Sequence, residues 1–232
     1  ESLSAATPDH PAMLIHTSGH GVFVNQKAMT LVELGDDTVA PVGGEIVRDE
    51  NGKATGMMRE SAQDVFRQAY SGHQGRRPAG VAEDEMRRMV RLAGEESLRH
   101  GITSFQDLGT SFAEVDLLKI MADEGNLPVR LYMAFEEEAA DMQDRLAEYR
   151  MVGYGNNFLT VRAIGEKVLD GALGTHGGWL LEPYTDMPSS VGLVLDSPDD
   201  IEATGQIAIR HGLQLNTHAI GARGNRVNLS VY

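Results

Sequence analysis

The chain has 232 residues, a formal net charge of −14 at pH 7 and no cysteine. This length allows one large domain or two small ones, and a hydrophobic content of 41% suffices for a core. The acidity argues against a nucleic-acid partner, and the absence of cysteine excludes disulfides, thiolate metal ligands and a cysteine nucleophile. No stretch approaches the roughly 20 apolar residues of a membrane span, so no membrane partner is expected. A cytoplasmic location is expected, although a chain without cysteine is equally compatible with a processed, secreted form.

The first 79 residues have irregular patterning. The expected elements are, in chain order, a strand over 12–16, a helix from its N-cap Asn25 to Leu34, a hairpin turned at Asn51-Gly52 and a helix over 59–68. Asn and Gly are the residues preferred at these cap and turn positions.

From Val81 onward, strands alternate with helices. Helices are predicted over 82–100, 112–124, 136–151, 199–211 and from 225 to the end, and strands over 102–106, 129–135, 159–169 and 213–216. Such alternation implies parallel strands joined by crossover helices. Polar residues follow several of these strands, where a (β/α) barrel or an open doubly wound sheet carries its active site.

Two groups of these polar residues are candidates for metal chemistry. His218 ends an alternating strand, and a neutral imidazole there can bind a metal or serve as a hydrogen-bonded structural residue. Glu166 and Lys167 are adjacent at the end of the preceding strand, so alternation lets only one of them point inward. His20 lies in a turn that suits contact with a substrate. The segment 171–178 is rich in glycine, but it fits neither a P-loop nor a dinucleotide-binding fingerprint.

Four motifs occur in order along the chain. They are His20-Gly21-Val22-Phe23-Val24-Asn25, Asp170-Gly171-Ala172-Leu173-Gly174, Leu181-Glu182-Pro183-Tyr184 and His218-Ala219-Ile220-Gly221. Together they resemble the metal-dependent amidohydrolase superfamily, in the branch called amidohydrolase family 3, which includes N-substituted formamide deformylase. The resemblance runs nearly from end to end of the chain.

This resemblance implies an α/β fold, a distorted TIM (β/α)8 barrel of which residues 80–232 supply strands 2–5. Residues 1–79 would be an irregular region inserted between barrel strands 1 and 2. It also implies one or two divalent ions, with zinc expected, at the C-terminal ends of the strands. His-x-His, a later His and an Asp complete the family's ligand set, and the chain contains no His-x-His and has nothing after Tyr232. We therefore expect an internal fragment of a longer protein.

The same resemblance assigns roles to individual residues. His218 matches the fifth-strand metal ligand, and Lys167, in carboxylated form, is the first choice for the bridging ligand of the fourth strand. Glu166 is the alternative, because it precedes Asp170 by the four positions typical of the branch. Lys167, His218 and Asp170 are the expected catalytic residues. His20 and His176 are the expected substrate contacts.

The implied activity is hydrolysis of non-peptide amide-type C–N bonds by a metal-activated water, with a small amide or formamide as substrate. An alternative from another class is a truncated, non-catalytic barrel module that associates with another copy of itself. A homo-oligomer is compatible with either, since an unpaired sheet edge invites association. An open doubly wound enzyme ranks last because it requires a phosphate-binding loop, which the sequence lacks.

Overall fold

A computed structural model describes residues 2–76, 80–137, 142 and 145–232 of the chain. The chain divides into two compact units, each described by itself below. The antiparallel unit comprises Glu1–Arg76, Val168–Ser197 and Ala219–Ser230, and the parallel unit comprises Arg77–Lys167, Pro198–His218 and Val231–Tyr232. Each unit has a hydrophobic core of its own. Among the described residues, no helix combines the length and the apolar character that a membrane crossing requires.

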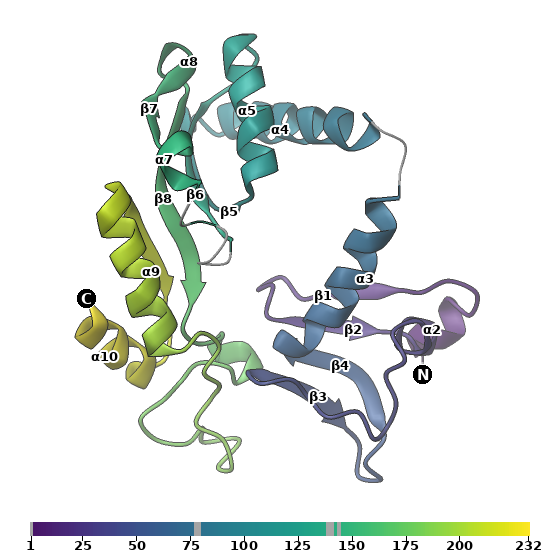
Figure 1. Cartoon of the computed structure of the whole chain (residues 1–232). Coiled ribbons are helices and arrows are strands. Elements are labelled where there is room, and N and C mark those ends of the chain that lie inside the picture. The colour runs from purple at the N-terminus through teal and green to yellow at the C-terminus, as the bar shows by residue number, and fades with distance from the viewer. Residues whose placement is uncertain (1, 77–79, 138–141, 143–144) are drawn as a thin grey trace. The chain divides into compact units, whose positions relative to one another are not determined.

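The antiparallel unit is built on a four-stranded sheet (Figure 1). Its strands are β1 (Met13–Ile15), β2 (Gly21–Val24), β3 (Gly44–Arg48) and β4 (Ala54–Glu60), in the order β1-β2-β4-β3. Every second residue of β4 is buried, from Ala54 to Glu60, because successive side chains of a strand point to opposite faces. Three of these four positions carry the apolar or small residues of a core, and the fourth carries a carboxylate.

The helices of this unit are short. They are α1 (Ser2–Ala6), α2 (Gln26–Leu31), the 3-10 turn η1 (Ser61–Gln63), α3 (Asp64–Gln74), the 3-10 turn η2 (Leu173–Thr175) and α10 (Ala222–Val231), whose last residue groups with the other unit. The predicted cap of α2 is confirmed, since the side chain of Asn25 accepts a hydrogen bond from the amide of Ala28 at 2.8 Å. The helix stops at Leu31 instead of Leu34 because Glu33 adopts a left-handed φ of 56°, which a helix cannot continue.

The parallel unit contains the alternating strands and helices. Its strands are β5 (Ser104–Thr110), β6 (Arg130–Phe135), β7 (Met151–Gly153), β8 (Leu159–Val168) and β9 (Gln214–His218). The sheet order is β5-β6-β8-β7, with β9 also paired to β8. The β5–β6 and β6–β8 ladders are parallel, which confirms the predicted α/β fold with a parallel sheet.

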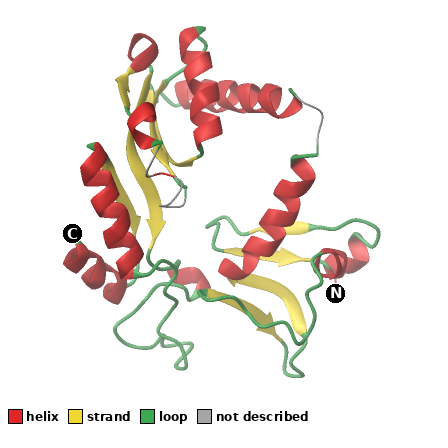
Figure 2. Cartoon of the chain, viewed as in Figure 1, coloured by secondary structure: helices red, strands yellow, loops and turns green. Residues whose placement is uncertain are grey.

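Helices connect these strands, as Figure 2 shows. They are α4 (Val81–Arg99), α5 (Phe112–Asp123), α7 (Leu146–Tyr149), α8 (Tyr154–Asn157) and α9 (Pro198–His211). Helix α5 starts in a complete capping box, in which Ser111 and Glu114 each bond the other's backbone amide. Helix α4 is followed by Gly101, whose left-handed φ of 75° is typical of a glycine that follows the end of a helix.

Two sequence-based boundaries were wrong. A helix was predicted from Arg59, but β4 continues to Glu60, because Arg59 pairs with Gly21 of β2 and Glu60 with Gly44 of β3. A helix was predicted over 136–151, part of which lies outside the described residues. Within the described part, α7 ends at Tyr149, and Met151 begins a strand by pairing with Val161. In both places strand pairing across the sheet overrides the local helical pattern.

Candidate functional site

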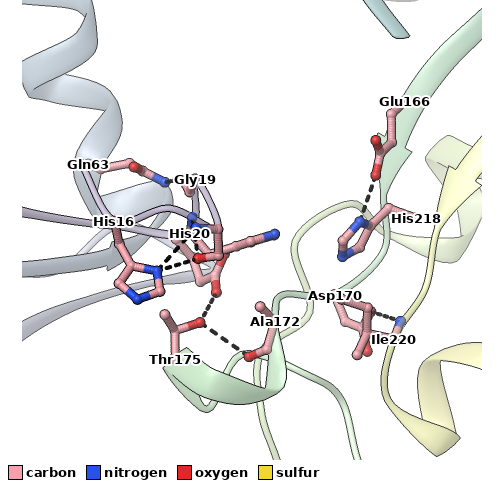
Figure 3. Close-up of polar contacts among 12 residues, drawn as sticks. His16, Gly19, His20, Gln63, Glu166, Asp170, Ala172, Thr175, His218 and Ile220 are labelled. Atoms are coloured by element: carbon pink, nitrogen blue, oxygen red, sulfur yellow. Dashed lines mark hydrogen bonds and ion pairs between the residues drawn. The ribbon is translucent and has the colours of Figure 1, made fainter. Parts of the chain in front are cut away.

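In the parallel unit, the side chains of Glu166 and His218 meet at the ends of two paired strands. Glu166 is near the end of β8 and His218 is the last residue of β9. The Glu166 Oε1 lies 2.6 Å from the His218 Nδ1 (Figure 3). The Glu166 and His218 side chains are 35% and 16% exposed, so solvent reaches part of the pair, while the His218 Nε2 is buried. A carboxylate and an imidazole are two of the side-chain types that bind zinc.

Lys167 follows Glu166 on the same strand and is half-buried. Side chains of consecutive strand residues point to opposite faces, as the sequence already predicted for this pair of positions. The residue in contact with His218 is Glu166, which stands four positions before Asp170. No group of three or more His, Asp or Glu side chains with metal-binding geometry occurs in the part of the chain that the structure describes.

Asp170, in the antiparallel unit, is completely buried and bonded to backbone amides. Its Oδ2 accepts from the amides of Trp179 at 2.6 Å and Gly221 at 2.7 Å. Its Oδ1 accepts from the amide of Ile220 at 2.8 Å, the contact drawn in Figure 3. Two of these amides belong to the segment immediately after His218. The carboxylate therefore fixes the backbone that leads away from this histidine and into α10.

His20 is bonded to a buried carboxylate that the sequence did not single out. The His20 Nδ1 lies 2.8 Å from the Glu60 Oε2, and the Thr175 hydroxyl donates to the Glu60 Oε1 at 3.0 Å. Thr175 is shown in Figure 3 with its second contact, to the carbonyl of Ala172. The Glu60 side chain is 1% exposed, whereas the His20 side chain is 19% exposed. The imidazole can thus be reached from solvent and the carboxylate cannot.

The backbone around Glu60 is strained and closely packed. Glu60 has φ 49° and ψ −132°, a region that non-glycine residues rarely adopt and that costs about 1–3 kcal/mol. A Cβ atom on either Gly171 or Gly177 would lie 2.2 Å from the Glu60 Oε1. Glycine is therefore required at both positions if the carboxylate is to occupy its place.

His176, the other predicted substrate contact, lies in the same glycine-rich segment. It adopts φ 59°, and its Nε2 lies 3.0 Å from the Asp186 Oδ2. The hydrogen bond from His176 lowers the pKa of the Asp186 carboxyl. The His176 ring packs edge-on against Tyr184 with 4.8 Å between ring centroids. Its Nδ1 is buried and has no hydrogen-bond partner among the described residues.

Sequence reasoning missed Glu60 and Thr175. Glu60 was assigned to a helix predicted over 59–68 and was not considered as a buried group. One signal was present: continuing the alternation of Ala54, Gly56 and Met58 by two residues puts Glu60 on the buried face. Thr175 carried no such signal, because its contact with Glu60 depends on the path of an irregular loop.

Comparison with known proteins places the chain in a family. A family model described as "Amidohydrolase family" matches residues 1–228. The chain belongs to the amidohydrolase family. The predicted resemblance is thereby confirmed over nearly the whole chain.

Two curated relatives and one solved structure are similar to nearly the whole chain. The N-substituted formamide deformylase of Arthrobacter pascens is 30% identical over 99% of this chain and 42% of its own length. The protein LONG AFTER FAR-RED 3 of Arabidopsis thaliana is 24% identical over 97% of this chain and 39% of its own length. The crystal structure of an uncharacterized metal-dependent hydrolase from Pyrococcus horikoshii OT3 matches 96% of this chain and 42% of that chain, at 22% identity and a TM-score of 0.67. The amidohydrolase chain thus spans about two fifths of the length of these relatives.

Proposed function

We propose that this chain is part of a longer metal-dependent hydrolase that cleaves non-peptide amide-type C–N bonds in small molecules. The observation that carries the proposal is the 2.6 Å contact between Glu166 and His218 at the ends of two paired strands. Membership of the amidohydrolase family and a fold like that of a metal-dependent hydrolase support it. A relative named N-substituted formamide deformylase makes amides and formamides the substrates to test first.

The donor set of this chain fits part of a metal site. His218 and Glu166 offer one nitrogen and one oxygen ligand of the types that zinc binds, whereas a catalytic zinc site uses three protein ligands. The described residues contain no third metal-binding side chain grouped with them. In the proposal, the remaining ligands belong to the portion of the relatives' length that this chain does not span.

Each candidate residue of this chain has a separate role in the proposed reaction. His218 and Glu166 hold the divalent ion, with zinc as the expected metal. A bound divalent ion supplies polarisation of the substrate carbonyl and activation of a water at neutral pH. Asp170 is a positioning residue in this scheme, because its bonds to the amides of Ile220 and Gly221 fix the backbone next to His218. His20 and His176 contact the substrate.

Glu166 and Lys167 remain rival bridging ligands, each offering a carboxylate, since lysine can be carboxylated. The sequence favoured Lys167. The contact with His218 favours Glu166, and so does its spacing of four positions from Asp170. We therefore propose Glu166 as the bridge and retain carboxylated Lys167 as the alternative that experiment must exclude.

Membership of the amidohydrolase family also supports a proposal for the fold of the longer protein. Strands β5, β6, β8 and β9 would be strands 2–5 of a TIM (β/α)8 barrel, and residues 1–79 an insertion between strands 1 and 2. The parallel ladders from β5 through β6 to β8 support this assignment. A closed barrel needs strands that only a longer chain can supply.

The test is hydrolysis by the full-length protein. It is purified, its metal content is measured, and it is assayed against a panel of N-formyl and N-acyl compounds before and after chelation. We expect bound zinc or another divalent metal, turnover of at least one compound, loss on chelation and recovery when metal is returned. A metal-free protein that hydrolyses none of the panel would instead support the non-catalytic barrel module, and its mass in solution would report whether it pairs with another copy.

A further inference from the structure

We propose that Glu60 is a positioning residue for His20, holding the proton of that imidazole on Nδ1 so that Nε2 acts as a hydrogen-bond acceptor toward the substrate. The proposal rests on the proposed function, in which His20 contacts the substrate. It adds a residue that neither the motifs nor the metal ligand set includes.

The first support is the contact itself and its burial. The His20 Nδ1 and the Glu60 Oε2 are 2.8 Å apart, and the carboxylate is almost completely buried while the imidazole keeps a fifth of its surface exposed. A buried carboxylate is costly unless it is paired. The carboxylate is paired by two neutral donors among the described residues, the His20 ring nitrogen on Oε2 and the Thr175 hydroxyl on Oε1.

The second support is how many separate elements surround this one carboxylate. The Thr175 hydroxyl donates to the Oε1 that His20 does not bond. Gly171 and Gly177 leave the space in which the carboxylate sits, and the main chain of Glu60 itself adopts a strained conformation. Strain of this kind persists only where surrounding structure enforces it, and it is concentrated at functional sites.

The backbone also ties the two residues together. The amide of Glu60 donates to the carbonyl of His20 at 3.0 Å, beyond the regular β2–β4 ladder. On the other side of the turn, the side chain of Gln63 donates to the carbonyl of Gly19 at 3.0 Å (Figure 3). The carbonyls of His20 and of the preceding Gly19 are therefore both hydrogen-bonded, and the His20 ring is held at Nδ1.

The chemistry follows from the acceptor character of a carboxylate. An ionised carboxylate has no proton to donate, so the proton between Glu60 and His20 belongs to Nδ1. In the neutral ring the other nitrogen, Nε2, then carries a lone pair and accepts from an N–H or O–H group of the substrate. A carboxylate that fixes a histidine tautomer in this way can be worth several powers of ten in catalysis, as in the serine-protease triad.

The decisive experiment is a double-mutant cycle on kcat/KM in the full-length protein, with Glu60→Gln, His20→Gln and the double variant. We expect each single substitution to lower kcat/KM by about tenfold to a hundredfold. The double variant is expected to be no worse than His20→Gln alone, because Glu60 acts only through His20. Additive losses in the double variant, or an unchanged kcat/KM in Glu60→Gln, would overturn the proposal.

A spectroscopic measurement covers the case in which Glu60→Gln is unstable and is independent of turnover. Protein labelled with 15N-histidine reports by NMR which ring nitrogen of His20 carries the proton, with the His20→Gln variant identifying its signals. We expect the proton on Nδ1 in the wild type and a shift toward Nε2 in Gly177→Ala, whose new Cβ displaces the carboxylate. Gly174→Ala is the matched control from the same loop, since nothing lies within 4 Å of its added Cβ.

The two readouts separate this inference from the proposed function. A wild-type protein that hydrolyses no amide but carries the His20 proton on Nδ1 contradicts the proposed function and leaves the Glu60–His20 arrangement supported. An active wild type in which Gly177→Ala leaves the tautomer unchanged contradicts the inference alone. A His20 proton on Nε2 in the wild type also overturns it.

Discussion

The two units each contain a histidine bonded to a glutamate, and the two pairs differ in what surrounds the carboxylate. In the parallel unit, Glu166 is about one-third exposed and contacts His218 at 2.6 Å. In the antiparallel unit, Glu60 is 1% exposed, accepts a second bond from Thr175 and is enclosed by two glycines. In the first pair, called the open pair below, both side chains are partly exposed, whereas in the second, called the closed pair, only the imidazole is accessible.

Because the two histidine–glutamate contacts differ in burial, the same type of contact can serve two purposes. An exposed imidazole–carboxylate pair can rearrange around a cation, because solvent lowers the cost of separating its members. A buried carboxylate is held by its partners and keeps a fixed geometry, because leaving it unpaired would be expensive. We therefore assign ligand binding to the open pair and orientation of an imidazole to the closed pair.

The largest expected effect concerns activity at the open pair. His218→Asn and Glu166→Gln in the full-length protein are each expected to lower kcat/KM for an amide substrate by about a hundredfold or more, since even residues that merely support metal ligands are worth about ten- to a hundredfold. Steady-state kinetics with metal in excess measures this. His100→Asn, on the exposed end of α4, is the control and is expected to retain full activity. A wild-type kcat/KM in either His218→Asn or Glu166→Gln would contradict the assignment of ligand binding to this pair.

The next effect concerns stability and reverses the ranking of the pairs. His20→Ala leaves the buried Glu60 carboxylate without the hydrogen bond to its Oε2, which is expected to lower the free energy of unfolding by about 3 kcal/mol. His218→Ala is expected to cost less, because Glu166 can be hydrated once its partner is removed. Chemical denaturation of the two variants, measured in the absence of metal, provides the comparison. Equal losses would mean that burial does not distinguish the pairs.

Asp170 provides a carboxylate of a third kind, bonded only to backbone. Asp170→Asn replaces one acceptor oxygen with an NH2 group that faces amide donors, so we expect a loss of about 2 kcal/mol in the free energy of unfolding. Asp186→Asn, at a side chain that is 73% exposed, is the control and is expected to leave the melting temperature unchanged. Coinciding unfolding curves for the wild type and Asp170→Asn would contradict the positioning role proposed for Asp170.

The smallest expected effect concerns how closely the Glu60 carboxylate of the closed pair is packed. Gly177→Ala is expected to destabilise the protein by about 1–2 kcal/mol, because its Cβ would lie 2.2 Å from the Glu60 Oε1. The corresponding change at Gly174, where space is open, is expected to alter stability by less than about 0.5 kcal/mol. Differential scanning calorimetry of the two variants measures the contrast. Identical melting temperatures would show that Glu60 is not closely enclosed.

Periodicity predicted the elements that depend on local pattern. The helical spacing of apolar residues located α4, and the Asn25 cap located α2, each to within a few residues. It failed where pairing across a sheet decides the conformation, at Glu60 and at Met151. A strand's length depends on residues distant in the sequence, which local propensity does not report.

The candidate site was predictable only in part, for a related reason. His218 and Glu166 lie at strand ends, and parallel strands bring such ends together, so their proximity followed from the fold. The choice between Glu166 and Lys167 depends on the direction of each side chain at the end of β8, which the sequence left open. Glu60 and Thr175 meet through an irregular loop, and no spacing rule relates positions 60 and 175.

The central claim is that Glu166 and His218 share a divalent ion in the full-length protein. A crystal structure of that protein grown with zinc, with anomalous data collected at the zinc edge, tests it most directly. We predict an anomalous peak within bonding distance of the His218 imidazole and the Glu166 carboxylate, with Lys167 unmodified. A peak bonded to a carboxylated Lys167 instead of Glu166, or zinc bound elsewhere with the Glu166–His218 hydrogen bond intact, would contradict the claim.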